Sequence, residues 1–291
     1  MLKHPLTIGI WNQKGGVGKT TTSTNLAGGI KLLCPELSVL LIEGDAQGTI
    51  KSYFRLKHSA SDASFASFLI DGVSITSDGL NKVEVVPGSS FDVLLATKGL
   101  SEADQKMVTF PRREETLKTR FKSLTERWDV IIIDCAPAFS MVTQNVLTFV
   151  DHLLIPTTMD PFALPGLTAV FEHVAVVEKY FERKINILGI LPTIYDQRVK
   201  MSGDVLKAIK KGFPESHVFD PIGVDSLIRT AQLRQRLIYH YLDESRAASQ
   251  YLQLSRNVLS LAGIEASKSD LEKSKPPRQR RKKEGLNEST L

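Results

Sequence analysis

The sequence predicts an α/β protein with a doubly wound, mostly parallel sheet and helices on both of its faces. Three observations lead to this fold class. Short apolar runs bounded by Gly, Pro or Asp alternate with longer amphipathic segments, as in βαβ units. The run at residues 130–133 is apolar at every position, which is typical of a central strand covered on both faces. The chain of 291 residues is also long enough to bury one large core.

The same alternation places the elements along the chain. Strands are predicted at residues 6–11, 38–43, 83–87, 91–96, 129–134, 152–156 and 185–191. Helices are predicted at residues 19–33, 115–127, 143–150, 164–183, 202–212, 225–233 and 245–262. Residues 1–266 are therefore expected to form one domain. Residues 267–291 are basic and lack aromatic side chains, so we expect a disordered tail that buries too little apolar surface to fold.

Composition and charge limit the functional classes. The net charge is +5, but residues 267–291 alone hold eight Lys or Arg against four acids. The remaining body is nearly neutral, so attraction to DNA must come from local clusters of basic side chains. No apolar run approaches the roughly 18 residues of a membrane-spanning helix, and no secretory leader is visible. We expect a cytoplasmic protein in which Cys34 and Cys135 are buried thiols.

Residues 11–22, WNQKGGVGKTTT, lie between a predicted strand and a predicted helix. Glycines in this loop let successive backbone N–H groups turn toward phosphate oxygens. Lys19 is placed to contact the β- and γ-phosphates, and the Thr20 hydroxyl to bind Mg²⁺. Gln13 departs from the general phosphate-loop pattern, and a plain glycine-rich turn is the alternative. The loop residues predicted to bind nucleotide are Gly15, Gly16, Val17, Gly18, Lys19, Thr20 and Thr21.

Two acidic residues follow predicted strands. Asp134 ends the strand at 129–134, the place where a carboxylate holds a magnesium-bound water in phosphate-loop enzymes. Asp45 follows the strand at 38–43, where an acid can orient the attacking water or support the metal. Helix capping or turn formation is the alternative for both residues.

Four segments, in this order, resemble the ParA/MinD group of deviant Walker A ATPases, and most closely its ParA branch. They are NQKGGVGKTTT, then LLIEGDAQGT at 40–49, WDVIIIDCAPAFS at 128–140 and IPTTMDPFALPGL at 155–167. The resemblance covers residues 5–263. It implies the fold of a P-loop NTPase, with ATP and Mg²⁺ as cofactors.

The resemblance also implies roles for single residues. Lys14 is similar to the family's signature lysine, which reaches across an ATP-dependent sandwich dimer to the partner's phosphates. Asp45 matches the aspartate that activates the attacking water. Thr20 and Asp134 match the magnesium residues. The expected catalytic residues are thus Lys14, Lys19 and Asp45, and Lys14 joins the nucleotide-binding set.

The chain departs from the family pattern at three places. Glu43 stands where aspartate is usual, and the extra methylene suits a metal-shell role through water better than direct ligation. Ala46 replaces a proline. The late family motif is reduced to residues 219–225, FDPIGVD, in which Pro221 is the candidate for contact with adenine.

Proteins of the ParA branch bind DNA without sequence preference, through basic residues near the end of the folded body. Lys207 and Lys211 are four residues apart and share a helix face. Each basic residue taken alone is equally well explained as solvated surface charge. The predicted DNA-contacting residues are Lys200, Lys207, Lys210, Lys211, Arg229, Arg234, Arg236 and Arg256. The resemblance further implies association with the nucleoid and a ParB-like adaptor that stimulates weak intrinsic hydrolysis.

Three other functions are weighed. A MinD-like ATPase for site selection would need an amphipathic membrane helix, and the tail has too few large apolar residues for one. An electron-delivering ATPase of the nitrogenase iron-protein type would need cysteines placed for a shared cluster. A kinase or biosynthetic transferase would need an acceptor pocket, for which the sequence gives no signal.

Overall fold

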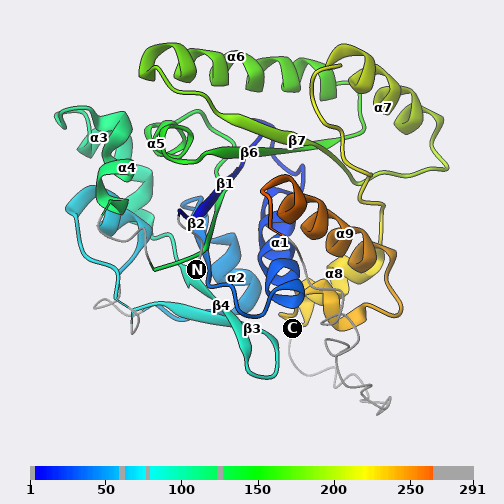
Figure 1. Ribbon diagram of the computed structural model, residues 1–291, viewed down its shortest axis with the longest axis horizontal. Coiled ribbons are helices and arrows are strands. Elements are labelled where there is room, and N and C mark those ends of the chain that lie inside the picture. The colour runs from blue at the N-terminus through cyan, green and yellow to red at the C-terminus, as the bar shows by residue number, and fades with distance from the viewer. Residues whose placement is uncertain (1–3, 59–62, 77–78, 123–126, 265–291) are drawn as a thin grey trace.

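A seven-stranded sheet is the centre of the molecule, with strand order β3-β4-β2-β5-β1-β6-β7 (Figure 1). The computed structural model describes residues 4–58, 63–76, 79–122 and 127–264. All strand pairs in this sheet are parallel except β3 with β4, which form an edge hairpin. The prediction of a mostly parallel sheet is confirmed. The strands are β1 Leu6–Ile10, β2 Val39–Gly44, β3 Asn81–Val86, β4 Ser89–Leu94, β5 Val130–Cys135, β6 His152–Thr158 and β7 Asn186–Thr193.

Helices cover both faces of the sheet, and the central strand shows why. In β5, Val130 and Ile132 belong to one hydrophobic core, while Ile131 and Ile133 belong to the core on the other face. The side chains of a strand alternate between faces, so a strand that is apolar throughout serves two cores. The described helices are α1 Lys19–Leu33, α2 Thr49–Phe54, α3 Ala103–Lys106, α4 Thr116–Phe121, α5 Met141–Phe149, α6 Ala163–Phe181, α7 Lys200–Gly212, α8 Ser226–Leu233 and α9 Arg246–Leu261.

Some helix predictions are corrected by the structure. The segment expected to be helical over 115–127 forms only a 3₁₀ turn and α4 among its described residues. Arg127, the last residue of that predicted helix, lies outside α4, and its guanidinium donates to the carbonyl oxygen of Ile75 at 2.8 Å. The short helices α2 and α3 have no counterpart in the sequence prediction. The predicted tail, 267–291, lies outside the described residues.

Helices α1 and α9 pack closely against each other, beside the loop that precedes α1. A Cβ on Gly29 would lie 2.1 Å from the hydroxyl oxygen of Ser255, so only glycine allows this close approach. This contact places α9 alongside α1 (Figure 1), while α8 reaches the start of α1 through a hydrogen bond from Gln232 to Thr21. Within the described part of the chain, no helix combines the length and apolarity needed to cross a membrane.

Candidate functional site

The loop between β1 and α1 has the backbone that its glycines predict. Gly16 and Gly18 adopt positive φ angles of 74° and 82°, a region that strains residues with a Cβ. Helix α1 begins at Lys19, and its N-cap, Gly18, gives no side-chain hydrogen bond. The first N–H groups of α1 and the positive end of its dipole therefore suit an anion held by the loop.

The side chain of Lys19 folds back over the loop. Its ammonium donates to the carbonyl oxygens of Asn12 at 3.0 Å and Lys14 at 2.9 Å, and the residue is 8% exposed. Burial lowers the pKa of Lys19, although the nearby Asp134 opposes that change. A phosphate beside this buried ammonium would stabilise its charged form.

Asp134 lies at the end of β5 with a nearly fully buried carboxylate, 1% exposed. Its two oxygens accept hydrogen bonds from the hydroxyls of Thr20 at 2.7 Å and Ser23 at 3.0 Å. Burial raises the pKa of Asp134 to about 7, and the two hydroxyls only partly offset this effect. Ser23 was missed by sequence reasoning, although its position three residues after Thr20 on one helix face is a usable signal.

These oxygen atoms fit a hard divalent cation. A hydroxyl beside a buried carboxylate is the donor set that Mg²⁺ uses together with substrate phosphates and water. Among the described residues, no group of three or more His, Cys, Asp or Glu side chains could hold a metal ion by itself. A cation at Thr20 and Asp134 would therefore depend on phosphate oxygens to complete its coordination.

Glu43 near the end of β2 and Asp45 directly after it lie in very different surroundings. Asp45 is half-buried, and its carboxylate accepts a hydrogen bond from the backbone N–H of Gln47 at 2.9 Å. Glu43 is 0% exposed, and its carboxylate accepts hydrogen bonds from backbone N–H groups on α2 and after β4. Both carboxylate oxygens of Glu43 are therefore bonded to backbone N–H groups, and a metal-shell role for this residue stays a prediction.

Lys14, at the entrance of the loop, is engaged with its own chain. Its ammonium forms an ion pair with Asp160 and donates to the hydroxyl of Thr158 at 3.1 Å. The ring of Phe162 lies 5.8 Å from it, centroid to ammonium. Burial by itself would raise the pKa of Asp160, but hydrogen bonds from Lys14 and Thr158 hold it below its ordinary value.

A cavity of about 210 Å³ adjoins the loop on the side of α8. The side-chain amide of Gln232, on α8, donates to the hydroxyl of Thr21 at 3.2 Å and so joins the cavity wall to α1. Pro221, the sequence candidate, immediately precedes the lining stretch. The lining residues are Gly16, Gly18, Thr21, Thr193, Ile194, Ile222, Gly223, Val224, Asp225, Ile228, Arg229, Gln232 and Tyr251.

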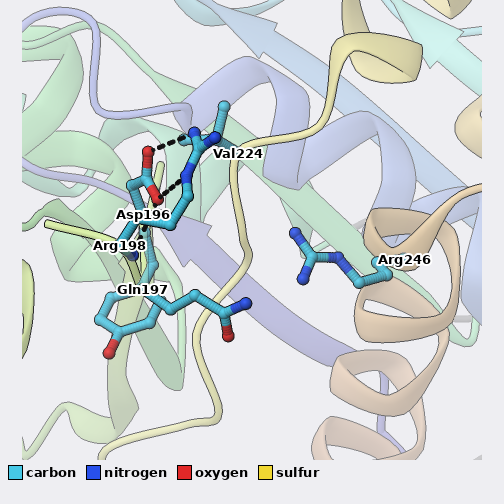
Figure 2. Close-up of a pocket in the computed structure, with 6 residues that line it drawn as sticks. Asp196, Gln197, Arg198, Val224 and Arg246 are labelled. Carbon is cyan, nitrogen blue, oxygen red and sulfur yellow. Dashed lines mark hydrogen bonds and ion pairs between the residues drawn. The ribbon is translucent and has the colours of Figure 1, made fainter.

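A second cavity, of about 250 Å³, meets the first at Val224. Figure 2 shows Asp196 and Arg198 joined on one side, with the guanidinium of Arg246 extending toward them from α9. The Asp196–Arg198 pair is bidentate, at 2.9 and 2.7 Å. Because Arg198 is largely satisfied by this pair, the cavity wall is close to charge-balanced on that side.

The structure separates the predicted DNA-contacting residues. Those on α7 and those at the end of α8 lie on either side of α9 in Figure 1. Arg229 lines the cavity beside the loop, and Arg256 is half-buried on α9. Arg229 is itself exposed, and the other six exposed residues form two groups: Lys200, Lys207, Lys210 and Lys211 on α7, and Arg234 and Arg236 after α8.

Comparisons with known proteins decide the family. The family model described as an AAA domain matches residues 6–187. The sporulation initiation inhibitor protein Soj of Bacillus subtilis is 32% identical over 86% of this chain and 97% of Soj. The chromosome partitioning protein ParA of Myxococcus xanthus is 31% identical over 87% of each chain. The chain belongs to the ParA/Soj family.

Solved structures agree with this membership of the ParA/Soj family. Apo McdA from Cyanothece has a TM-score of 0.77 and 25% identity, covering 88% of this chain and all of McdA. A cobyrinic acid a,c-diamide synthase from Mycobacterium smegmatis has a TM-score of 0.73 and 25% identity, covering 89% of this chain and 96% of the synthase. That synthase was crystallised with ADP and magnesium, and also with an ATP analogue and magnesium.

The two cysteines are buried, as predicted, but in different cores of this ParA/Soj family member. Cys34 belongs to the core that contains α1 and α9, and Cys135 to the core on the other face of the sheet. Burial raises the pKa of the Cys135 thiol. The two thiols are therefore placed as small apolar core residues rather than as a pair of cluster ligands.

Proposed function

We propose that this chain is a ParA-type ATPase whose ATP-bound form is a sandwich dimer on DNA and whose hydrolysis positions cargo. The presence of two lysines at one loop carries the proposal. Lys19 is buried over the loop, whereas Lys14 lies at the entrance with a third of its side chain exposed. The second lysine is therefore available to a phosphate that its own loop does not hold.

The proposed roles follow from the site. The loop N–H groups and Lys19 bind the phosphates of ATP. Thr20 and Asp134 hold Mg²⁺, which when bound neutralises charge on the β- and γ-phosphate oxygens. Asp45 orients the water that attacks the γ-phosphate. The base occupies the cavity beside Gly18, and Pro221 remains a proposed neighbour of the adenine.

Dimerisation, in this proposal, exchanges one contact of Lys14 for another. In the single chain its ammonium is paired with Asp160. In the dimer it leaves this carboxylate and contacts the phosphates bound by the partner. The exchange makes association depend on bound nucleotide, because the partner's phosphates must replace the ion pair that Lys14 loses.

The variant Lys14→Gln tests this role. Light scattering after gel filtration is expected to show dimers of the unchanged chain with ATP and Mg²⁺, and monomers of the variant. ATP affinity is expected to change by less than about threefold, since Lys19 and the loop remain. Lys106→Gln, at an exposed lysine paired with Glu102 on another face, is the matched control. Normal dimerisation of Lys14→Gln would refute the proposed role.

We further propose that the dimer binds DNA without sequence preference and is released when a ParB-like adaptor stimulates hydrolysis. The two exposed basic groups support this, because a dimer doubles the number of phosphate contacts. The logarithm of affinity for a random-sequence duplex is expected to fall with log salt by about 0.9 per contact. Replacing the lysines of α7 by glutamine in one variant, and Arg234 and Arg236 by glutamine in another, would show which of the two groups contributes to DNA affinity.

The partition function is favoured over the alternatives by its relatives. Soj and ParA match over nearly the whole of this chain at 31–32% identity. The similarity to the diamide synthase is weaker in sequence, at 25% identity, and is a similarity of fold. A MinD-like membrane role is not favoured. We propose a cytoplasmic, nucleoid-associated protein whose ATPase domain is residues 1–266, followed by a basic tail.

A further inference from the structure

Helix α2 is hydrogen-bonded to two parts of the molecule to which the proposed function gives different roles: the end of β2, next to Asp45, and the turn that carries Arg234 and Arg236. It begins four residues after Asp45 and ends at Phe54. One attachment lies at its first turn, next to the hydrolytic aspartate. The other lies in its last turn and reaches the exposed turn that carries Arg234 and Arg236.

The first attachment is made by Glu43. One of its carboxylate oxygens accepts hydrogen bonds from the backbone N–H groups of Ile50 at 2.6 Å and Lys51 at 3.1 Å. The other accepts one from the N–H of Ala96 at 3.1 Å. Gly48, the N-cap of α2, supplies no side-chain hydrogen bond, so Glu43 caps the helix from a neighbouring strand. The carboxylate thus fixes α2 to β2 and to the chain after β4.

The second attachment is made by Tyr53. Its hydroxyl donates to the carbonyl oxygen of Arg236 at 2.8 Å. This turn is held in an unusual conformation, because Gln235 has a φ angle of 54°. On its other side, the N–H of Arg236 bonds to the carbonyl of Ala231 on α8 at 2.9 Å. A displacement of α2 therefore acts on the peptide group that directly follows Arg236, at the end of the turn that carries the two exposed arginines.

We propose that α2 couples the nucleotide state sensed at Asp45 to DNA binding by the turn at residues 234–236, with Glu43 and Tyr53 as its two attachment points. The inference rests on the proposed function. When Asp45 and the loop around it adjust to the γ-phosphate, α2 shifts with them, and Tyr53 passes the shift to Arg236. Coupling of this kind is reciprocal, so DNA changes nucleotide affinity by the same factor.

The variant Tyr53→Phe removes the hydroxyl and keeps the ring. The quantity to measure is the ratio of DNA affinities with a non-hydrolysable ATP analogue and with ADP, from fluorescence anisotropy of a random-sequence duplex. For the unchanged chain a ratio of about 5–150 is expected. Tyr53→Phe is expected to lower it at least about threefold, and to lower the effect of DNA on nucleotide affinity by the same factor. Tyr180→Phe, at an exposed tyrosine on α6, should leave both unchanged.

Two further measurements keep the test decisive. Nucleotide affinity without DNA and analogue-induced dimerisation are expected to remain within about twofold for Tyr53→Phe, because one neutral hydrogen bond remote from the phosphates is removed. The proposal would be overturned if Tyr53→Phe lowered the ratio of DNA affinities and also abolished dimerisation. It would likewise be overturned if the variant kept the full ratio. Glu43→Gln, which keeps the size but not the charge of the cap, is expected to lower the ratio as well. If the unchanged chain shows no nucleotide-dependent DNA binding, the proposed function itself fails.

Discussion

Asp134 near the end of β5 and Asp45 directly after β2 belong to neighbouring strands of one sheet, yet the protein holds them in opposite ways. Glu43 on β2 pairs in register with Asp134 on β5. Asp45 is therefore only two residues further along the chain than the residue paired with Asp134. Asp134 is buried and fixed by two hydroxyls of α1, whereas Asp45 is half-buried and bonded within its own turn. In the proposed roles, the carboxylate that supports the metal is therefore held in place by two hydroxyl groups before a cation binds, whereas the carboxylate that orients the water is bonded only within its own turn.

Among substitutions that test this difference between the two carboxylates, the largest effect on ATP hydrolysis is expected at Asp45. Asp45→Ala should lower ATP hydrolysis about 10²–10⁴-fold, the range for loss of a group that handles the attacking water. ATP affinity should change by less than about twofold, because the loop and Lys19 are untouched. Phosphate release and nucleotide titration measure the two quantities. Asp243→Ala, at an exposed acid, is the control. Full activity in Asp45→Ala would remove Asp45 from the catalytic role.

The second test is at Asp134. Asp134→Asn keeps the shape of the side chain but removes its charge, so the Mg²⁺ requirement for nucleotide binding should rise about 10–100-fold, as for partners that act through a metal-bound water. Titrating Mg²⁺ at fixed ATP measures this shift. An unchanged requirement would separate Asp134 from the metal and leave it as a cap for Thr20 and Ser23.

Asp225 sharpens the comparison, since it is a third carboxylate held by hydrogen bonds. It accepts from the N–H of Leu227, the hydroxyl of Ser245 and the N–H of Ala247, which joins α8 to α9 at the cavity. Asp225→Ala should cost about 1–2 kcal/mol in the free energy of unfolding, as for a lost N-cap. Urea denaturation measures the loss, and a change at Asp243 should have no comparable effect.

The same residue gives a pH dependence with a definite sign. Burial alone would raise the pKa of Asp225, but its three hydrogen bonds hold it below the ordinary value of 3.8. A depressed pKa contributes stability above that value and loses it as the pH falls through the folded pKa. The stability difference between the unchanged chain and Asp225→Asn should therefore shrink below about pH 4. A difference that grows toward acid would contradict this account.

The smallest effect is expected at Ser23. Ser23→Ala removes one of the two hydroxyl groups that donate to Asp134. It should weaken Mg²⁺-dependent nucleotide binding about two- to tenfold, which corresponds to the roughly 0.5–1.5 kcal/mol of one hydrogen bond. Ser52→Ala, at an exposed hydroxyl on α2, is the matched control. If Ser23→Ala were as severe as Asp134→Asn, the buried carboxylate would depend on its hydroxyls more than on its charge.

The parts predicted well are those with local causes. The glycines of residues 15–18 and the helical period after them place the start of α1 at Lys19, as the structure has it. The apolar run of β5 predicts a strand between two cores. By contrast, α2 was missed because it is six residues long and is capped by Glu43, which lies on the preceding strand β2 and not at the N-cap position. The capping signal is therefore absent from its own sequence.

The sequence by itself determined the α/β architecture, the phosphate loop and the family, because periodicity, glycine positions and short motifs are local properties of the chain. The tertiary structure alone decided which polar groups meet. It paired Lys14 with Asp160, placed Ser23 on Asp134, turned Glu43 toward α2 and separated the basic residues into two groups. The pairs Lys14–Asp160 and Ser23–Asp134 join residues more than 100 positions apart in the chain, and only the packing of both cores around the sheet brings them together.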